Sequence, residues 1–355
     1  MSTKPFDIIA FGHPCVDYAI HIDHMPVSNE SAAILDCSWQ GGGVTTTGVV
    51  AAARQGLKCA LVGAQGDDLF GRFCYRDFLD HGIDLSHLAV RRDRTTDIGT
   101  ILSDAQFGGR SILYRGGSYE RLDERETDWD FFLKGDYLYI ATGDSYHVRA
   151  AKYVKENGGK VLIDAGYGTM KDFGEILPFI DYFVGSEFLY NASFDSRDYE
   201  SCMREISGKG PGLVVFTFGA QGARAYSREE GYMEIPGFRV PVVDTVGAGD
   251  VFHGAFFYGL INGYSAAETI RYASAVAAIK CTTIGGRAGI PTPEVTHRFL
   301  NTGEIDRREL EARRARYSWG LDAAFREGIS GASLPGWNPQ PALSAPAEIL
   351  PGRQG

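Results

Sequence analysis

The feature that most constrains the fold of this chain is a repeated alternation between short apolar runs and segments of helical period. The runs are rich in β-branched and aromatic residues, and most are followed by Gly, Ser or Asp. They are apolar at successive positions, which is typical of strands buried on both faces. The alternation predicts an α/β fold in which a mostly parallel central sheet is sandwiched by helices. The runs are FDIIAFG, KCALVGA, DYLYIAT, KVLIDA, DYFVGS and LVVFTFG.

Two segments break this rhythm, residues 18–40 and about 95–118. Both alternate apolar and polar residues, as half-exposed strands do. They predict small β excursions from the main sheet that form a cover, or lid, over a site. An ordinary edge hairpin would show the same period, so the pattern by itself leaves that alternative open.

The character of the sequence changes again after residue 303. Residues 304–328 have the charges of an amphipathic helix, and the remainder is rich in Pro, Gly, Ala and Ser, as flexible tails are. We therefore predict a main domain over 1–303, and a C-terminal helix with a flexible tail over 304–355. Truncation after about residue 303 is expected to leave the fold and the activity largely unchanged.

Composition argues against several kinds of partner. The 355 residues carry a formal net charge of −10, which disfavours binding to nucleic-acid phosphates. The apolar runs fall short of the ~18 residues of a membrane span, and the N-terminus lacks the apolar core of a signal peptide. Six widely spaced cysteines without a CxxC pair predict reduced thiols rather than zinc or disulfides. We expect a cytoplasmic protein with no nucleic-acid and no membrane partner.

The stretch DTVGAGDVFHGAF, residues 244–256, joins a glycine turn to a long apolar helix. Gly247 and Gly249 allow a tight turn and the close approach of a ligand. Unpaired N–H groups at the start of the helix form an anion hole suited to phosphate. Asp250, in the first turn, would face its occupant and take a proton from a hydroxyl that attacks phosphorus. An isolated Asp here would instead be a helix cap or dipole partner, worth ~1 kcal/mol.

The extent of this motif favours the catalytic interpretation. Asp-Thr-x-Gly-Ala-Gly-Asp arises by chance on the order of 10⁻⁷ per site, and the stretch resembles the signature of the pfkB/ribokinase family of sugar and nucleoside kinases. GGGVTTTGVVAAARQGLKCALVGAQGDDLFG is similar to the family's N-terminal signature, and FGHPCVDYAI to its first strand. VVFTFGAQGARAYS resembles the nucleotide-binding strand and turn, and AAIKCTTIGGRAGIPT the closing segment. The resemblance covers about residues 6–300 and looks closest to the sulfofructose-kinase-like branch. It implies a ribokinase-like fold with a small β-lid.

The resemblance also implies roles for individual residues around the reacting groups. Asp250 would be the catalytic base. The phosphoryl group in transit would be stabilised by backbone amides of the glycine turn, those of Gly247, Ala248 and Gly249.

On the substrate side, the resemblance implies a pocket lined by Asp17, Gly42, Gly43 and Thr47. Many relatives have Asn at the position of Thr47, and a Thr hydroxyl reaches less far and offers fewer hydrogen bonds. Arg115, in ILYRGGS, is similar to an Arg that meets the sugar acid in ketodeoxygluconate kinases. An exposed hairpin charge would give the same local pattern.

ATP is the implied phosphoryl donor, with Mg²⁺ to neutralise its charge. The residues implied to bind the nucleotide are Ser186, Thr217, Gly219, Gly222 and Ser274. Relatives often carry an Asn-x-x-Glu motif tied to magnesium and phosphate, and this chain departs from it, with Ser186 for the Asn and Leu189 for the Glu. Glu187 would have to substitute through water.

A monovalent cation such as K⁺ is a further expectation from the resemblance. In this chain the matching positions are Asp244 with the backbone of Val246, Lys280, Thr283 and Gly285.

The implied activity is ATP-dependent phosphorylation of a primary hydroxyl on a small sugar, a ketose or a sugar acid. A nucleoside kinase on the same fold is an alternative, in which Phe107, Tyr114 or Trp39 would supply an aromatic face for the base. A catalytically silent sugar-binding paralogue is a third interpretation. We take His253 to be a packed or a surface histidine rather than a site residue, and we expect a homodimer through the lid by analogy with the family.

Overall fold

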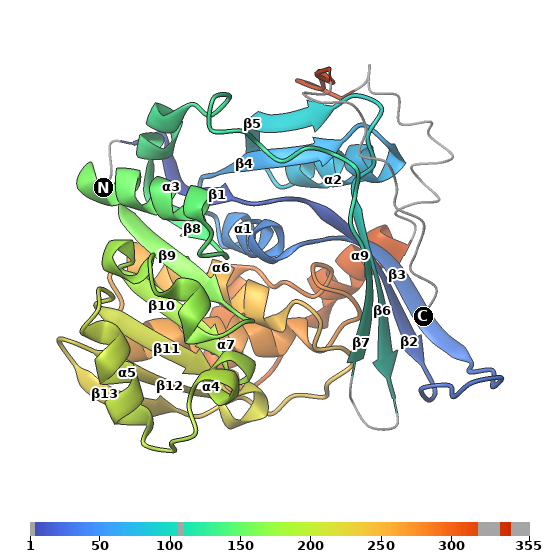
Figure 1. Cartoon of the computed structure of the whole chain (residues 1–355). Helices are drawn as coiled ribbons and strands as arrows, with labels where there is room; N and C mark the ends of the chain where they lie inside the picture. The colour runs from blue at the N-terminus through green and yellow to red at the C-terminus, as the bar shows by residue number, and fades with distance from the viewer. Residues whose placement is uncertain (1–3, 106–109, 319–333, 342–355) are drawn as a thin grey trace.

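The six apolar runs are all strands of one nine-stranded sheet in the computed structural model, which describes residues 4–105, 110–318 and 334–341 (Figure 1). The strand order is β13-β12-β11-β10-β9-β8-β1-β4-β5. From β11 to β5 every neighbouring pair is parallel, and only β12 runs in the opposite direction, antiparallel to both β11 and β13. The predicted mostly parallel sheet is therefore confirmed. The bounds are β1 Phe6–Phe11, β4 Cys59–Gly66, β5 Asp84–Arg91, β8 Gly135–Ile140, β9 Lys160–Ala165, β10 Tyr182–Ser186, β11 Leu213–Thr217, β12 Ala223–Ser227 and β13 Gly231–Ile235.

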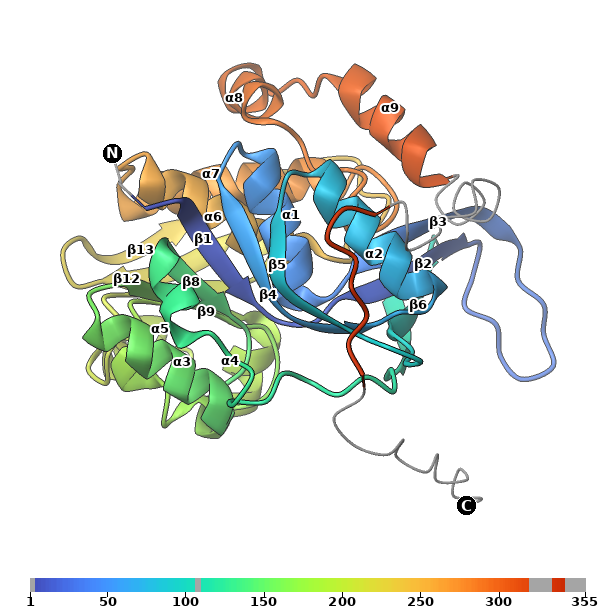
Figure 2. The same ribbon diagram turned by 90° about the horizontal axis from the view of Figure 1, so that it is seen from above.

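Helices cover both faces of this sheet (Figure 2). One face packs against α1 (Val44–Arg54), α2 (Leu69–Asp80), α6 (Ala248–Ile261) and α7 (Ala266–Lys280), and the other against α3 (Ser145–Glu156), α4 (Glu187–Ser193) and α5 (Tyr199–Ser207). Neighbouring residues such as Ile8 and Ile9 belong to opposite cores, and both are fully buried. This two-sided burial explains why the strands are apolar at successive positions. Helix α8 (Pro293–Thr302) packs outside α7.

The two alternating segments build a separate four-stranded sheet, the lid, which extends away from the main sheet (Figure 1). Its order is β3-β2-β6-β7, with β2 and β6 parallel in the middle and an antiparallel partner on each side. The bounds are β2 Cys15–Ile22, β3 Ile34–Gly42, β6 Asp97–Asp104 and β7 Arg110–Arg115. Strand β6 alternates buried and half-buried residues, whereas β7 is exposed along its length. The predicted β excursions are thus a second sheet rather than edge hairpins of the first.

The charged C-terminal helix is α9, Arg307–Ser318. Part of the segment that follows also packs on the body, because residues 334–341 run beside the edge strand β5. The backbone N–H of Gln340 donates to the carbonyl oxygen of Val90 (2.6 Å), and its carbonyl oxygen accepts from the backbone N–H of Arg92 (2.8 Å). The ring of Trp337 packs edge-on against that of Tyr75, with the ring centroids 5.2 Å apart. These contacts lead us to reverse the expectation that residues after 303 are dispensable. The domain boundary itself stays a prediction, and the rest of the tail lies outside the described residues.

In the described part of the chain, no helix combines the length and the apolar character needed to cross a bilayer.

Candidate active site

The glycine turn before α6 has the backbone geometry that the motif predicts. Gly247 precedes the first residue of the helix with φ of 70°, and a Cβ at this position would lie 2.9 Å from Cα of Gly286. Only glycine meets both conditions without strain. The backbone N–H of Ala248 donates to the carbonyl oxygen of Thr245. The N···O distance of 3.2 Å is at the long end of the range for such hydrogen bonds. The predicted anion hole therefore depends chiefly on the amides of Gly247 and Gly249.

Asp250 is half-buried in the first turn of α6. Burial raises the pKa of its carboxyl group well above the ordinary value, and the negative charges of Asp164 and Asp17 raise it further. The positive charges of Arg110 and Lys280 oppose this shift. A carboxylate with a raised proton affinity is suited to accept a proton from an alcohol.

A buried histidine–carboxylate contact lies next to the first turn of α6. The Nδ1 atom of His253 is 2.6 Å from the carbonyl oxygen of Gly249 and 3.0 Å from Oδ2 of Asp164. Tyr139 donates its hydroxyl to the same carboxylate oxygen over 3.3 Å. His253 is 3% exposed and Asp164 2% exposed, so of the two alternatives for His253 the structure shows the packed histidine. The pair ties the turn that carries Asp250 to the end of β9.

Asp17, on β2, faces Gly42 at the end of β3. A Cβ at Gly42 would lie 2.2 Å from Oδ2 of Asp17, and one at Gly99 would lie 2.7 Å from Oδ1. Burial raises the pKa of Asp17 to about 6, although a hydrogen bond from Cys15 and the charge of Arg287 act to lower it. The lid strands thus deliver a carboxylate that titrates close to neutral pH.

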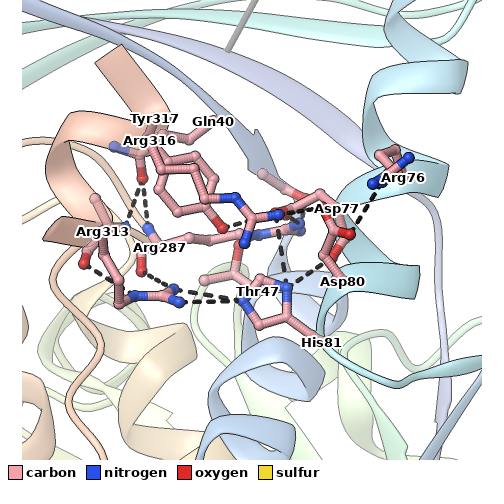
Figure 3. A network of polar contacts seen from close by, with 12 residues as sticks. Gln40, Thr47, Arg76, Asp77, Asp80, His81, Arg287, Arg313, Arg316 and Tyr317 are labelled. Atoms are coloured by element: carbon pink, nitrogen blue, oxygen red, sulfur yellow. Dashed lines mark hydrogen bonds and ion pairs between the residues drawn. The ribbon is translucent and has the colours of Figure 1, made fainter. Parts of the chain in front are cut away.

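The guanidinium group of Arg287 contacts both Gly42 and Thr47, and Arg287 is fully buried. Figure 3 shows it beside Thr47. Its Nη2 donates to the carbonyl oxygen of Gly42 (2.9 Å), and its Nε lies 3.5 Å from Oγ1 of Thr47. Its Nη1 donates to Oδ2 of Asp77 on α2 (2.6 Å). Gly43, the fourth pocket residue, is the N-cap of α1.

Helix α9 completes this network (Figure 3). Tyr317 donates its hydroxyl to Oδ1 of Asp77 over 2.7 Å, and Arg313 donates to the carbonyl of Arg287 over 3.0 Å. On the other side, Oε1 of Gln40 accepts the backbone N–H of Arg287 at 2.7 Å. Helix α9 therefore supports β3, the strand that ends at Gly42. No sequence motif indicated this role.

The predicted nucleotide residues gather at the carboxyl ends of the neighbouring strands β10 and β11, where Ser186 and Thr217 are partners in register. In parallel sheets this edge is where ligands bind. The hydroxyl of Ser186 donates to the carbonyl of Gly166 (2.6 Å) and caps α4 by accepting from Leu189. Its visible role is thus structural.

The remaining nucleotide and magnesium residues come from a turn and from two helices. Gly219 and Gly222 flank the tight turn between β11 and β12, and Ser274 is half-buried on α7. Glu187 is the half-buried first residue of α4. Within residues 4–105, 110–318 and 334–341, no three His, Cys, Asp or Glu side chains cluster as metal ligands would.

Two hydrogen bonds connect the lid to the loop before the anion hole. Ser103, on β6, donates to Oδ1 of Asp244 over 2.9 Å, and Nη1 of Arg110, on β7, donates to Oγ1 of Thr245 over 3.1 Å. Arg115 is exposed at the opposite end of β7. The lid cation that acts on Asp250 is therefore Arg110, which sequence reasoning missed although it lies on the same strand.

Two of the residues expected to hold a monovalent cation, Asp244 and Val246, contact an ammonium group instead. The Nζ of Lys280 donates to the backbone carbonyls of Asp244 (3.0 Å) and Val246. Of the oxygens expected to coordinate the ion, the Val246 carbonyl already accepts from this charged donor, and both oxygens of the Asp244 carboxylate accept hydrogen bonds from Ser103, Val246 and Gly285. These residues therefore do not fit a bound K⁺.

Comparisons with known proteins find relatives that are named as kinases of sugars, sugar acids and nucleosides. Ribokinase of Haemophilus influenzae is 29% identical over 293 residues, covering 80% of this chain and 95% of that protein. A nucleoside kinase of Methanothermobacter thermautotrophicus is 28% identical over 300 residues, covering 82% and 95%. A 5-dehydro-2-deoxygluconokinase of Clostridium perfringens is 25% identical over 334 residues, covering 87% and 97%.

Solved structures share the fold. Ribokinase of Thermotoga maritima matches with a TM-score of 0.70 at 24% identity, covering 84% of this chain and all of that chain. Arabidopsis thaliana ribokinase, solved with ribose and ATP, matches with a TM-score of 0.70 at 21% identity, covering 83% and 98%. The description of pfkB family carbohydrate kinases matches residues 11–293, which include the lid, the glycine turn and Asp250. The chain belongs to the pfkB family of carbohydrate kinases.

Proposed function

We propose that the protein transfers the γ-phosphoryl group of ATP to a primary hydroxyl of a small sugar, a ketose or a sugar acid. The observation that carries this proposal is the position of Asp250. It stands in the first turn of α6, directly after the glycine turn, and its charge interacts with that of the Asp17 carboxylate. An alcohol held by Asp17 would present its hydroxyl to Asp250, with the phosphate in the anion hole.

The phosphate side of the reaction is supported by the start of α6. The helix N-terminus and the amides of Gly247 and Gly249 favour the charge that develops on the transferred group. Mg²⁺ would neutralise the phosphates of ATP, and Glu187 is the residue that would meet it through water. This assignment fits the absence of a carboxylate cluster in the described part of the chain, because Mg²⁺ is commonly held by phosphates and water.

The sugar side is supported by Asp17 and Thr47. An ionised Asp17 accepts hydrogen bonds from two hydroxyls of a polyol. The Nε of Arg287 approaches Oγ1 of Thr47, and a hydroxyl that accepts from Arg287 would keep its hydrogen for donation to the substrate. A carboxylated sugar would need a cation, and Arg110 and Arg115 on β7 are the candidates.

A nucleoside is the second candidate substrate. A relative named nucleoside kinase is 28% identical, and Tyr18 and Trp39 form a stacked pair on the lid with centroids 4.2 Å apart. Such a face would stack on a base. Tyr114 is 63% exposed, and Phe107 lies outside the described residues.

A screen for ADP release would test the function, with ketoses, aldoses, sugar acids and nucleosides as acceptors. Turnover with a sugar and none with nucleosides supports the proposal, and the reverse result establishes the nucleoside kinase. Sugar binding without ADP release under any metal condition would support the catalytically silent paralogue. Asp250→Asn, run alongside, separates acceptor phosphorylation from contaminating ATPase activity. The homodimer through the lid stays a prediction.

A further inference from the structure

The last residue of α7 places a charge where a metal ion was expected. Lys280 is fully buried, and a buried ammonium is costly unless its donors are satisfied. Its Nζ donates to the backbone carbonyls of Asp244 and Val246, both in the loop that leads into the glycine turn. The amino group of lysine has three donors and no acceptor, so carbonyl oxygens suit it as they suit a metal cation.

The carboxylate of Asp244 closes the same site. It accepts hydrogen bonds from the backbone of Val246 (2.9 Å) and Gly285 (2.9 Å) and from the hydroxyl of Ser103 (2.9 Å). Burial acts to raise the pKa of Asp244, but the charge of Lys280 and these donors outweigh it and hold the pKa below its ordinary value. Two carbonyl oxygens thus hold one fixed positive charge, and the negative charge of the Asp244 carboxylate interacts with it.

The position of this charge matters for the anion hole. Lys280 ties the end of α7 to residues 244–246, directly before Gly247, and the backbone N–H groups of Val243 and Asp244 also bond to the carbonyl of Cys281. The charge of Lys280 also acts to lower the pKa of Asp250. Both the geometry of the turn and the charge of the base are therefore linked to this side chain.

We propose that the ammonium group of Lys280 is a built-in monovalent cation, so that the enzyme needs neither K⁺ nor Na⁺. A second cation on the same carbonyl oxygens would meet the ammonium at contact distance, where like charges repel strongly. The inference rests on the proposed function for its link to catalysis, but the occupancy of the site does not.

The first test uses the wild-type chain. Activity with the best acceptor and the unfolding temperature are measured in KCl, NaCl and tetramethylammonium chloride at equal ionic strength. We expect both to be the same in all three salts. A K⁺-specific rise in either would overturn the proposal. If no acceptor is phosphorylated, the proposed function fails, and the unfolding temperature still decides the question of the cation.

Two variants sharpen this test. Lys280→Ala leaves space and unpaired carbonyls, so we expect activity to fall about tenfold or more and to recover in part with K⁺, together with a K⁺-dependent rise in unfolding temperature. Lys280→Met has a similar length without the charge, and it should lose activity without recovery in K⁺. Full activity of Lys280→Ala without K⁺ would contradict the inference. If Lys280→Ala does not fold without K⁺ but folds with it, the inference is supported; if neither variant folds, the wild-type salt comparison decides.

Discussion

Tyr317 on α9 donates a 2.7 Å hydrogen bond to Asp77 on α2, and the other oxygen of that carboxylate accepts from Arg287. Burial acts to raise the pKa of Asp77, but the charges of His81 and Arg287 and the Tyr317 hydrogen bond lower it below the ordinary value. Asp77 is therefore ionised, and Arg287 is held in the orientation in which it also bonds to Gly42. A helix near the end of the chain thus orders the proposed sugar site.

Replacing Tyr317 by Phe should weaken sugar binding more than catalysis. The change removes one hydrogen bond to a buried carboxylate, worth about 1.5–3 kcal/mol, and loosens Arg287 beneath Gly42 and Thr47. We expect KM for the acceptor to rise about tenfold, while KM for ATP and kcat change little. Amide hydrogen exchange at residues 40–47 should become faster in the same variant.

Arg316→Ala is the matched control for this prediction. Arg316 also connects α9 to α2, through an ion pair with Asp80. It is half-exposed, and this pair has no link to β3. It should leave both the acceptor KM and the exchange of residues 40–47 unchanged. Equal effects of the two variants would show that α9 acts only through general docking.

The parts of the site that could be predicted from sequence are those encoded by local backbone geometry. Gly247 and the start of α6 follow one another in the chain, so their turn and the position of Asp250 are written in consecutive residues. The alternation of β6 likewise predicted a strand outside the main sheet. Neither feature depends on a distant partner.

Pairs of residues that are far apart in sequence were not predictable in this way. Arg287 pairs with Asp77, 210 positions earlier in the chain. Asp164 contacts His253 only because the end of β9 lies next to the first turn of α6. Such contacts need the full topology before they can be seen. Lys280 was matched to the cation site by its backbone, while its side chain supplies the cation.

Asp250→Asn tests the proposed base. The amide keeps the shape of the carboxylate but cannot accept the proton of the alcohol, so kcat should fall by about 10³-fold. Binding of ATP, measured by calorimetry, should remain close to that of the wild type because the glycine turn is intact. Near-normal turnover would remove Asp250 from the mechanism.

Asp17 predicts an acid limb in sugar binding. Its pKa is about 6, so below that pH the side chain is protonated and accepts fewer hydrogen bonds. We expect KM for the acceptor to rise as pH falls from 7 to 5, measured with saturating ATP. In Asp17→Asn the KM should be high and independent of pH over this range.

The same shift makes a prediction about stability. The folded pKa of Asp17 is raised, so its contribution to stability is fully present below about pH 4 and is lost as pH rises towards 6. At pH 8 the ionised, half-buried carboxylate destabilises the fold by about 2 kcal/mol, after allowance for its partial exposure to solvent. Asp17→Asn should therefore be more stable than the wild type to urea at pH 8, and the difference should vanish near pH 4.

The two arginines of β7 should behave differently. Arg110 bonds to Thr245 beside the anion hole and acts to lower the pKa of Asp250, whereas Arg115 is exposed at the other end of the strand. Arg110→Ala should raise the pKa of Asp250, so the acid limb of kcat should move to higher pH. Because the lid also loses its bond to Thr245, kcat at pH 7 should fall about tenfold.

Arg115→Ala serves as the control for charge on the same strand. With a neutral sugar as acceptor it should leave kcat, KM and the acid limb unchanged. With a sugar acid, a selective rise in KM would instead assign Arg115 to the carboxylate of the substrate, because that charge would lose its partner. An identical shift of the acid limb in both variants would contradict a specific role for Arg110. Asp250 would then respond only to the overall charge of the lid.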